Sequence, residues 1–384
     1  MDSITHLAAG ALTPLAFARA PRLGAVVLFG IVAGEMPDID VVAGVSARAM
    51  LDIHRGPTHS LPALLIFATL LALLCNAWLK HVARKQQAIS PPEPLPACKQ
   101  AGNWPFVQIW LAALLALLLH VYLDSMTTFG TRVFWPVSDL RVALPALFII
   151  DPLFTLPLLG VLVYCLLGLR RCGKEAGKPT APGERDKIGL WARRALVWVA
   201  VYPLVCLGLN GFTAWQLNRD LADGSNIHVT TTPLSPFLWK AVQETEHEYR
   251  LATVSLFGVL TGKEPEFGKA YPRAAAAPEL YWNTLRESLD ICRSYSAFAS
   301  YPVVRSSVTE PESRVREITF EDLRYTPAGS KDLSRLYDRG GSMFLFQVRL
   351  DDESGELLAW RYLSAFDEVD SAGWVELETP IPLN

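Results

Sequence analysis

Histidines and aspartates that could bind a metal ion recur through the first 151 residues of this chain. The segment HRGPTHS, residues 54–60, places two histidines and an arginine within seven positions. His120 and Asp124 are four residues apart, so on a helix both side chains project from one face. Imidazole nitrogen and carboxylate oxygen are ligands that Zn²⁺ and similar divalent cations accept, so the pattern predicts a metal centre. The candidate ligands are His6, Asp38, Asp40, His54, His59, His120, Asp124 and Asp151.

These ligands are more numerous than one tetrahedral zinc site requires, so we expect one to three divalent ions, with zinc favoured. Two ions about 3.5–4 Å apart could stabilise both the attacking and the leaving oxygen of a phosphoester. Asp40 or Asp124 could bridge ions or act as a base toward a metal-activated water. Arg55 could pair with an anionic group of the substrate. The predicted catalytic residues are therefore Asp40, Asp124 and Arg55.

The same residues also have ordinary structural interpretations. The acidic pair in EMPDID could simply end a helix, and a hydroxyl in HRGPTHS could cap the next one. His120 and Asp124 could form a structural hydrogen bond, and Arg55 could contact lipid headgroups. Asp151 could accept from backbone donors that Pro152 frees. No one of these residues decides between the two interpretations.

The elements that must position these residues are apolar helices. About half of the chain, 51%, is hydrophobic, and several segments reach the roughly 20 residues that a bilayer span needs. The long apolar segments are 60–79, 105–124, 143–168 and 192–214. Segments 4–18 and 23–36 are shorter and could be short spans or a hairpin in the protein interior. We predict an α-helical polytopic membrane bundle of about six helices over residues 1–214, followed by a soluble α+β domain over 215–384.

Basic residues set the expected orientation in the membrane. Fourteen Lys and Arg residues fall in loops 19–22, 80–104 and 169–194. The opposite loops, 37–59 and 125–142, contain four. Because short loops rich in Lys and Arg stay in the cytoplasm, we expect a multi-pass inner-membrane protein whose candidate ligands and 215–384 domain are extracytoplasmic, in the periplasm where a cell has one.

The soluble part has its own pattern. Alternating residues predict strands at 248–257 and 315–325, and a hairpin formed by 343–350 and 357–363. Helical spacing predicts a helix over 278–298. This part carries 17 Lys and Arg against 26 Asp and Glu, which argues against nucleic acid as a partner. The six cysteines form no CxxC pair, so we expect no disulfide framework, and the N-terminus predicts no cleavable signal peptide.

Five motifs in order carry a resemblance. They are THLAAG at 5–10, PDID at 37–40, HRGPTHS at 54–60, HVYLDSMTTFG at 120–130 and IIDPLFTLP at 149–157. Over residues 1–165 the chain resembles bacterial inner-membrane proteins described as membrane-bound metal-dependent hydrolases, some of them labelled LexA-binding. The resemblance implies that the eight candidate ligands are polar positions of that family. A LexA partner does not fit an extracytoplasmic site, so the partner protein stays unassigned.

The ligand order is also similar, more distantly, to zinc-dependent phospholipase C. That analogy does not fix a reaction, and this chain has no N-terminal Trp as first ligand, which argues against a third ion. The favoured function is a membrane-bound hydrolase that cleaves a phosphoester of a lipid or lipid-linked substrate with a metal-activated water. Membrane lipids are the expected partners. The alternatives are a metal or proton transporter, and a non-catalytic adaptor with a structural metal.

Overall fold

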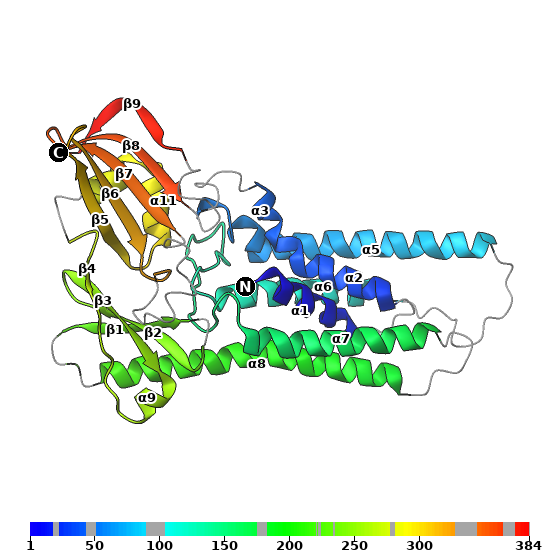
Figure 1. Ribbon diagram of the computed structural model, residues 1–384. Helices are drawn as coiled ribbons and strands as arrows, with labels where there is room; N and C mark the ends of the chain where they lie inside the picture. The colour runs from blue at the N-terminus through cyan, green and yellow to red at the C-terminus, as the bar shows by residue number, and fades with distance from the viewer. Residues whose placement is uncertain are drawn as a thin grey trace. The chain divides into compact units, whose positions relative to one another are not determined.

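The computed structural model of the protein describes most of the chain (Figure 1). The described residues are 1–17, 23–43, 51–89, 104–174, 183–219, 221, 224–232, 235–276, 281–326, 344–363 and 373–383. Some residues used for the predictions above lie outside these ranges, namely Arg19, Arg22, Arg48, Lys99, Lys178, 278–280 and 343.

The chain divides into two compact units. The first contains Met1–Asp40 and Arg55–Leu207, and the second contains Val41–His54 and Gly208–Asn384. The division falls inside a helix, a few residues before the predicted boundary at residue 214. Each unit is described separately below.

The first unit is helical. Its elements are α1 (Ser3–Phe17), α2 (Leu23–Glu35), η1 (Met36–Ile39), η2 (Pro57–His59), α5 (Leu61–Ile89), α6 (Phe106–Ser125), α7 (Pro152–Lys174) and α8 (Glu184–Asn218), and the short α3 (Asp40–Ala43) begins at its edge. Among the described residues, four helices are long and apolar enough to cross a membrane: α5, α6, α7 and α8. These helices expose many leucines, valines and isoleucines, as lipid-facing spans do. The predicted membrane bundle is confirmed.

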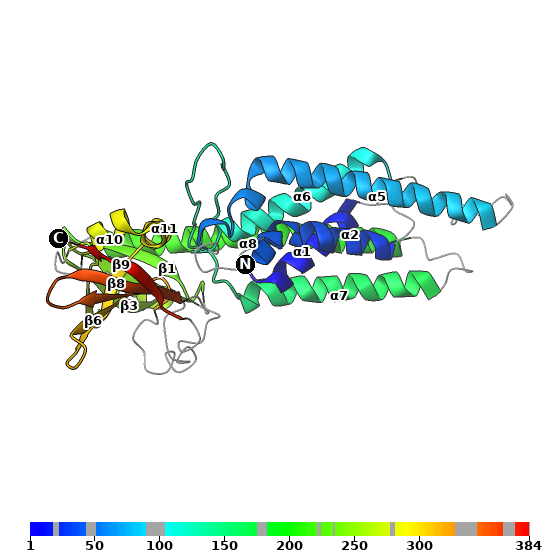
Figure 2. The same cartoon turned by 90° about the horizontal axis from the view of Figure 1, so that it is seen from above.

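Helices α1 and α2 are different from the four spans. They contain 15 and 13 residues, so each is only about 20 Å long, less than the roughly 30 Å of a bilayer core. Most residues of α1 are buried within the protein. The two helices run side by side in both views of the ribbon (Figures 1 and 2). The two short helices therefore lie partly in the protein interior, with Leu28 and Val32 of α2 exposed, which agrees with the second of the two alternatives that the sequence left open.

Glycines allow α1 and α2 to touch backbone to backbone. A Cβ atom added at Gly10 would lie 2.4 Å from the Gly30 carbonyl oxygen. One added at Gly34 would lie 2.8 Å from the carbonyl oxygen of His6. Side chains at these positions would force the helices apart, so the glycines fix the distance between His6 and the end of α2.

The second unit contains two antiparallel sheets. One has the order β1 (Asn226–Thr231), β2 (Leu238–Glu244), β3 (Glu248–Ser255) and β4 (Ala270–Pro272). The other has the order β5 (Pro302–Glu310), β6 (Val315–Asp322), β7 (Leu345–Asp351), β8 (Glu356–Leu363) and β9 (Val375–Pro382). Three helices accompany them: α9 (Leu256–Leu260), α10 (Trp282–Ser288) and α11 (Asp290–Phe298). The predicted soluble α+β region is confirmed.

The local predictions for this unit have mixed outcomes. The strands predicted at 248–257 and 315–325 are β3 and β6, and the predicted hairpin is β7 with β8. The helix predicted over 278–298 is interrupted, because Leu289 adopts an extended conformation (φ −118°, ψ 119°) between α10 and α11. The break lets Trp282 and Tyr295 pack at 6.2 Å between ring centroids, near Phe320 and Phe346 of the sheet. Strands β1, β2, β4, β5 and β9 were not predicted.

Candidate metal centre

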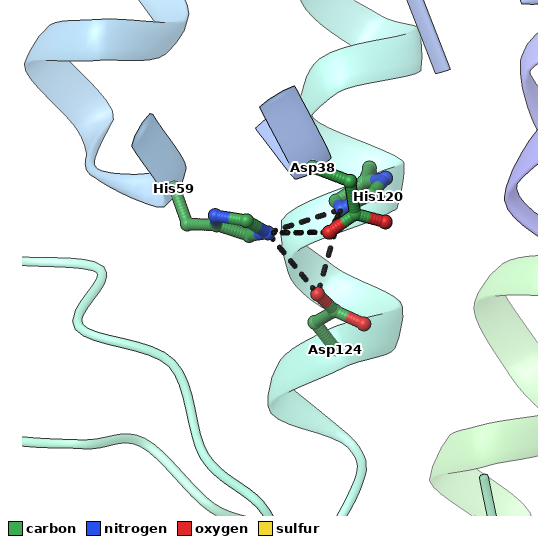
Figure 3. A group of neighbouring side chains, drawn as sticks. All are labelled: Asp38, His59, His120 and Asp124. Carbon is green, nitrogen blue, oxygen red and sulfur yellow. Dashed lines mark hydrogen bonds and ion pairs between the residues drawn. The ribbon is translucent and has the colours of Figure 1, made fainter. Parts of the chain in front are cut away.

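Four side chains from three parts of the helical unit converge at one end of the bundle (Figure 3). Asp38 lies in η1, directly after α2, where Pro37 ends the α-helix and starts a 3₁₀ turn. His59 ends η2, directly before α5. His120 and Asp124 lie one turn apart in the last two turns of α6. His59, His120 and Asp124 are buried, and Asp38 keeps 22% of its side chain exposed.

Five of the six separations between the potential ligand atoms of these residues are nearly equal. His59 Nε2 lies 3.2 Å from His120 Nε2, 3.4 Å from Asp38 Oδ1 and 3.3 Å from Asp124 Oδ2. His120 Nε2 lies 3.6 Å from Asp38 Oδ1 and 3.4 Å from Asp124 Oδ2. Ligands bound at about 2.0–2.1 Å around a tetrahedral zinc ion are about 3.3 Å apart. The cluster therefore has the dimensions of a four-coordinate cation site.

Hydrogen bonds on the far side of each imidazole direct Nε2 toward the cluster. His120 Nδ1 donates to the carbonyl oxygen of Gly34 at 2.6 Å. Thr58 Oγ1 donates to Asp40 Oδ2 at 3.0 Å, which leaves Thr58 Oγ1 to accept from His59 Nδ1, also at 3.0 Å. Both Nε2 atoms then carry lone pairs that face each other at 3.2 Å. Such a pair is stable only with a cation or a proton between the two nitrogens.

The two carboxylate oxygens of Asp124 have different neighbours. Its Oδ1 is contacted by Arg55 Nη2 at 2.9 Å, His6 Nε2 at 3.1 Å and the amino group of Met1 at 2.5 Å. Its Oδ2 is buried, has no hydrogen-bond partner among the described residues, and faces only the two imidazoles. A buried carboxylate oxygen without a donor costs free energy, and a metal ion at the cluster would remove that cost.

Electrostatics also favours a cation here. Burial lowers the pKa of His59, but the negative carboxylates of Asp124, Asp38 and Asp40, 3.3–3.4 Å from its ring nitrogens, outweigh burial and raise that pKa to about 10. The same negative charges that attract a proton to His59 would attract a divalent cation in its place.

Arg55 is buried and held from several sides. Its Nη1 donates to Thr127 Oγ1 at 2.9 Å, and its guanidinium lies 5.1 Å from the ring centre of Phe129. Its backbone has φ 55°, in the left-handed region that residues with a Cβ rarely adopt. The sequence predicted that Arg55 pairs with a substrate. The structure places its charge on Asp124, where it positions a ligand, and the pairing of Arg55 with a substrate stays a prediction.

Two other predicted residues, His6 and Asp40, contact the four clustered side chains. His6 contacts Asp124 and stacks on His120 at 3.8 Å between ring centroids. Asp40 is buried behind His59, where its Oδ2 accepts from Arg55 N at 2.9 Å and lies 3.3 Å from His59 Nδ1. Asp40 thus supports His59, and its predicted role as a bridging ligand or a base stays a prediction.

The last two predicted ligands, Asp151 and His54, are not among the four clustered side chains. Asp151 Oδ1 accepts from the backbone N–H groups of Leu153 and Phe154 at the start of α7, and Asp151 Oδ2 accepts from Tyr202 at 3.1 Å. These contacts are those of a helix cap, the structural alternative that Pro152 indicated, and they account for Asp151 without a metal. His54 belongs to the segment 41–54 of the second unit, and its role as a ligand stays a prediction.

Several residues of the site were missed from the sequence. Gly34 contributes only its carbonyl oxygen, and glycine offers no polar side chain to notice. Thr127 was overlooked although it follows Asp124 by three residues. Glu35 stands in the motif EMPDID, half-buried, and burial raises the pKa of its carboxyl to about 7. Its charge interacts with those of His120 and Asp38, so Glu35 belongs to the surroundings of the cluster.

A helical bundle with four potential spans and a buried His/Asp cluster at one end defines a polytopic membrane protein with a candidate metal centre. The chain belongs to the YdjM inner membrane protein family, which matches residues 1–217. It is 27% identical to protein YfhP of Bacillus subtilis (strain 168) over 160 residues, 40% of this chain and 42% of YfhP. It is 32% identical to inner membrane protein YbcI of Escherichia coli (strain K12) over 133 residues, 33% of this chain and 60% of YbcI. The chain thus spans less than two thirds of either relative, and no solved structure matches it.

Proposed function

We infer that the cluster of Asp38, His59, His120 and Asp124 binds one divalent cation, and that the protein is a membrane-bound metal-dependent hydrolase. The observation that carries the first part is the set of five separations between 3.2 and 3.6 Å among two imidazole nitrogens and two carboxylate oxygens. Two nitrogens and two oxygens as ligands suit Zn²⁺ better than the larger, oxygen-bound cations.

Hydrolysis is supported by what surrounds the ligands. A bound divalent cation would act as a Lewis acid toward a phosphoryl or carbonyl oxygen and lower the pKa of a water. Asp38 is the partly exposed member of the cluster, so water and substrate would reach the site on its side. Glu35, three residues away, has a pKa raised by burial to about 7, which suits a group that transfers protons near neutral pH. His6, Asp40 and Arg55 hold the ligands in place.

The proposed substrate is a phosphoester of a lipid or lipid-linked molecule. The cluster lies at the ends of helices that are long and apolar enough to cross the bilayer, with His59 two residues before α5 and Asp124 one residue before the end of α6. A substrate with an apolar tail and a polar head would place its head near such a site. The predicted extracytoplasmic orientation makes the outer leaflet the proposed source of substrate.

A specific observation favours the second candidate, an adaptor with a structural metal. Four protein ligands already complete a tetrahedron, whereas catalytic zinc sites usually keep a position open for water. Hydrolysis therefore requires Asp38, the exposed ligand, to leave room for water or substrate. If Asp38 stays bound, the cation would only hold α2, α5 and α6 together.

The test is metal analysis combined with an activity screen on purified full-length protein. The wild type should contain close to one equivalent of zinc, and His59→Ala should lose it, while the exposed Asp139→Asn should retain it. A panel of lipid phosphomonoesters, phosphodiesters and esters then tests turnover, with Glu35→Gln as a variant that should keep the metal and lose activity. Zinc without turnover on the whole panel would select the adaptor, and zinc content unchanged in His59→Ala would reject the centre itself.

A further inference from the structure

The interhelical loop, residues 126–151, connects α6 to α7 and exposes an unusual amount of apolar surface. Val137 is 92% exposed, Leu140 63%, Phe134 49% and Trp135 36%. Single exposed apolar residues are common on soluble surfaces, but four within seven positions of one loop form a patch of the kind that contacts a partner or a membrane.

The loop is an ordered structure. Thr131 and Val142 exchange two backbone hydrogen bonds, of 3.1 and 2.9 Å, at the base of its tip. Further back, Leu144 N donates to Ser125 O at 2.8 Å and Leu147 N donates to Met126 O at 2.9 Å, which fastens the loop to the end of α6. A fixed backbone that keeps apolar side chains pointing outward has a surface prepared for contact, because collapse of the loop would have hidden them.

The position of the tip relates it to the membrane surface. Leu61 N, at the first residue of the potential span α5, donates to Val133 O at 3.0 Å. Phe134 and Trp135 therefore lie close to the level at which α5 begins. In Figure 2 the teal hairpin between α6 and α7 projects across the direction of the helices. A hairpin at the end of the spans that runs across their axes lies along the bilayer surface.

We propose that the tip of the interhelical loop, Phe134 to Leu140, lies in the lipid headgroup region and inserts its apolar side chains toward the acyl chains. Aromatic and aliphatic side chains in an interfacial element bury about 5–10 Å into this boundary. Two charged side chains accompany the exposed apolar residues. Arg132 precedes them and is only 17% exposed, whereas Asp139 lies among them and, at 82% exposed, can reach polar headgroups.

This surface is joined to the metal cluster. Arg132 N donates to Arg55 O at 2.9 Å, and the bond from Leu61 to Val133 follows His59 by two residues. The segment that carries Arg55 and His59 is thus hydrogen-bonded at both ends to the interhelical loop, directly before the proposed tip. The inserted tip would hold the cluster at headgroup depth, whether the cation is catalytic or structural.

The experiment uses full-length protein in nanodiscs of phosphatidylethanolamine and phosphatidylglycerol. An environment-sensitive fluorescent amino acid replaces Val137, and in a matched variant it replaces Val308, which is 62% exposed on β5 of the soluble unit. We expect a blue shift at position 137, quenching by lipids that carry a shallow spin label, and loss of quenching by aqueous iodide. At position 308 we expect no blue shift, no quenching by the spin-labelled lipid, and strong quenching by iodide.

Two outcomes would overturn the proposal. If position 137 is quenched by iodide as strongly as position 308, the tip is in water. If position 137 is shielded from iodide but untouched by lipid-borne quenchers, a protein covers it, either a second copy or another partner. The same probe at position 140 guards against a local effect at 137, and metal content measured on each variant shows that the cluster is intact. Neither readout depends on hydrolysis. Membrane insertion of the tip can therefore be disproved while the proposed hydrolase function stands, and the hydrolase function can be disproved while tip insertion stands.

Discussion

The carboxylate of Asp40 offers a sharp test of the metal centre, because it lies behind His59 and outside the group of Asp38, His59, His120 and Asp124. Asp40 Oδ2 accepts from Arg55 N at 2.9 Å and from Thr58 Oγ1 at 3.0 Å, and it lies 3.3 Å from His59 Nδ1. Asp40→Asn keeps the volume and one acceptor oxygen but removes the negative charge. The imidazole then loses part of the field that orients it and makes Nε2 a good donor to a metal.

The expected size follows from comparable outer-shell carboxylates. Their removal typically lowers metal affinity 10–100-fold, which is about 1.4–2.7 kcal/mol. Loss of charge and loss of orientation both weaken metal binding, so Asp40→Asn should lower the affinity for zinc. His59→Ala removes a direct ligand and should cost more than Asp40→Asn. Asp139→Asn, an exposed carboxylate in the same helical unit, should bind zinc like the wild type.

The assay is competition for zinc between the purified full-length protein and a chromophoric chelator, for the wild type and the three variants. Affinity should decrease in the order wild type with Asp139→Asn, then Asp40→Asn, then His59→Ala. Wild-type affinity in Asp40→Asn would refute the role of Asp40 behind His59. A loss as large as that of His59→Ala would mean that Asp40 is itself a ligand, which also contradicts the reasoning.

Three further predictions concern packing and protonation. Gly34→Ala should lower the free energy of unfolding by about 1–3 kcal/mol in thermal or denaturant melts, because its Cβ would lie 2.8 Å from the carbonyl oxygen of His6. Asn218→Ala should cost about 1–3 kcal/mol in the same melts, because Asn218 satisfies both the N–H and the carbonyl of Ile227 at the edge of β1, whereas Gln216→Ala on the same helix should have little effect. Burial lowers the pKa of Lys240 from 10.5 to about 8, so the unfolded state binds more protons between these values and stability should rise with pH from 8 to 10.5, by up to about 3 kcal/mol. Pulse proteolysis across that range should show a shallower rise in Lys240→Met, and an unchanged slope would show that Lys240 is not the group responsible.

The sequence predicted the spans and the convergence of polar residues for identifiable reasons. Apolar length reports a span directly, because a bilayer tolerates little else, and α5 to α8 all show it. His120 and Asp124 could be paired from helical spacing alone. The sequence could not predict which residues face the cluster and which support them. Asp40 and Asp38 are two residues apart in one motif, yet one supports His59 and the other faces the cluster, a difference set by a single turn of 3₁₀ helix.

The features that the sequence did not predict depend on backbone atoms and on tertiary packing. Gly34 serves the site through a carbonyl oxygen, which every residue has, so no residue type signals it. Pro152 correctly indicated freed backbone donors near Asp151, but deciding between a cap and a ligand required the position of Tyr202. In the soluble unit, the helical spacing across 278–298 was real on both sides of Leu289, and packing of Trp282 and Tyr295 broke the helix between them.

The left-handed backbone at Arg55 sets two demands on one position that no single residue type meets. A backbone at φ 55° favours glycine or asparagine, by about 1 kcal/mol or more over arginine, whereas Asp124 and Thr127 require the guanidinium. Glycine at this position would relieve the backbone cost but would leave the buried carboxylate of Asp124 without its guanidinium, a larger cost of about 3–5 kcal/mol. Selection for heat resistance and selection for an intact cation site should therefore both retain Arg55, despite its backbone conformation.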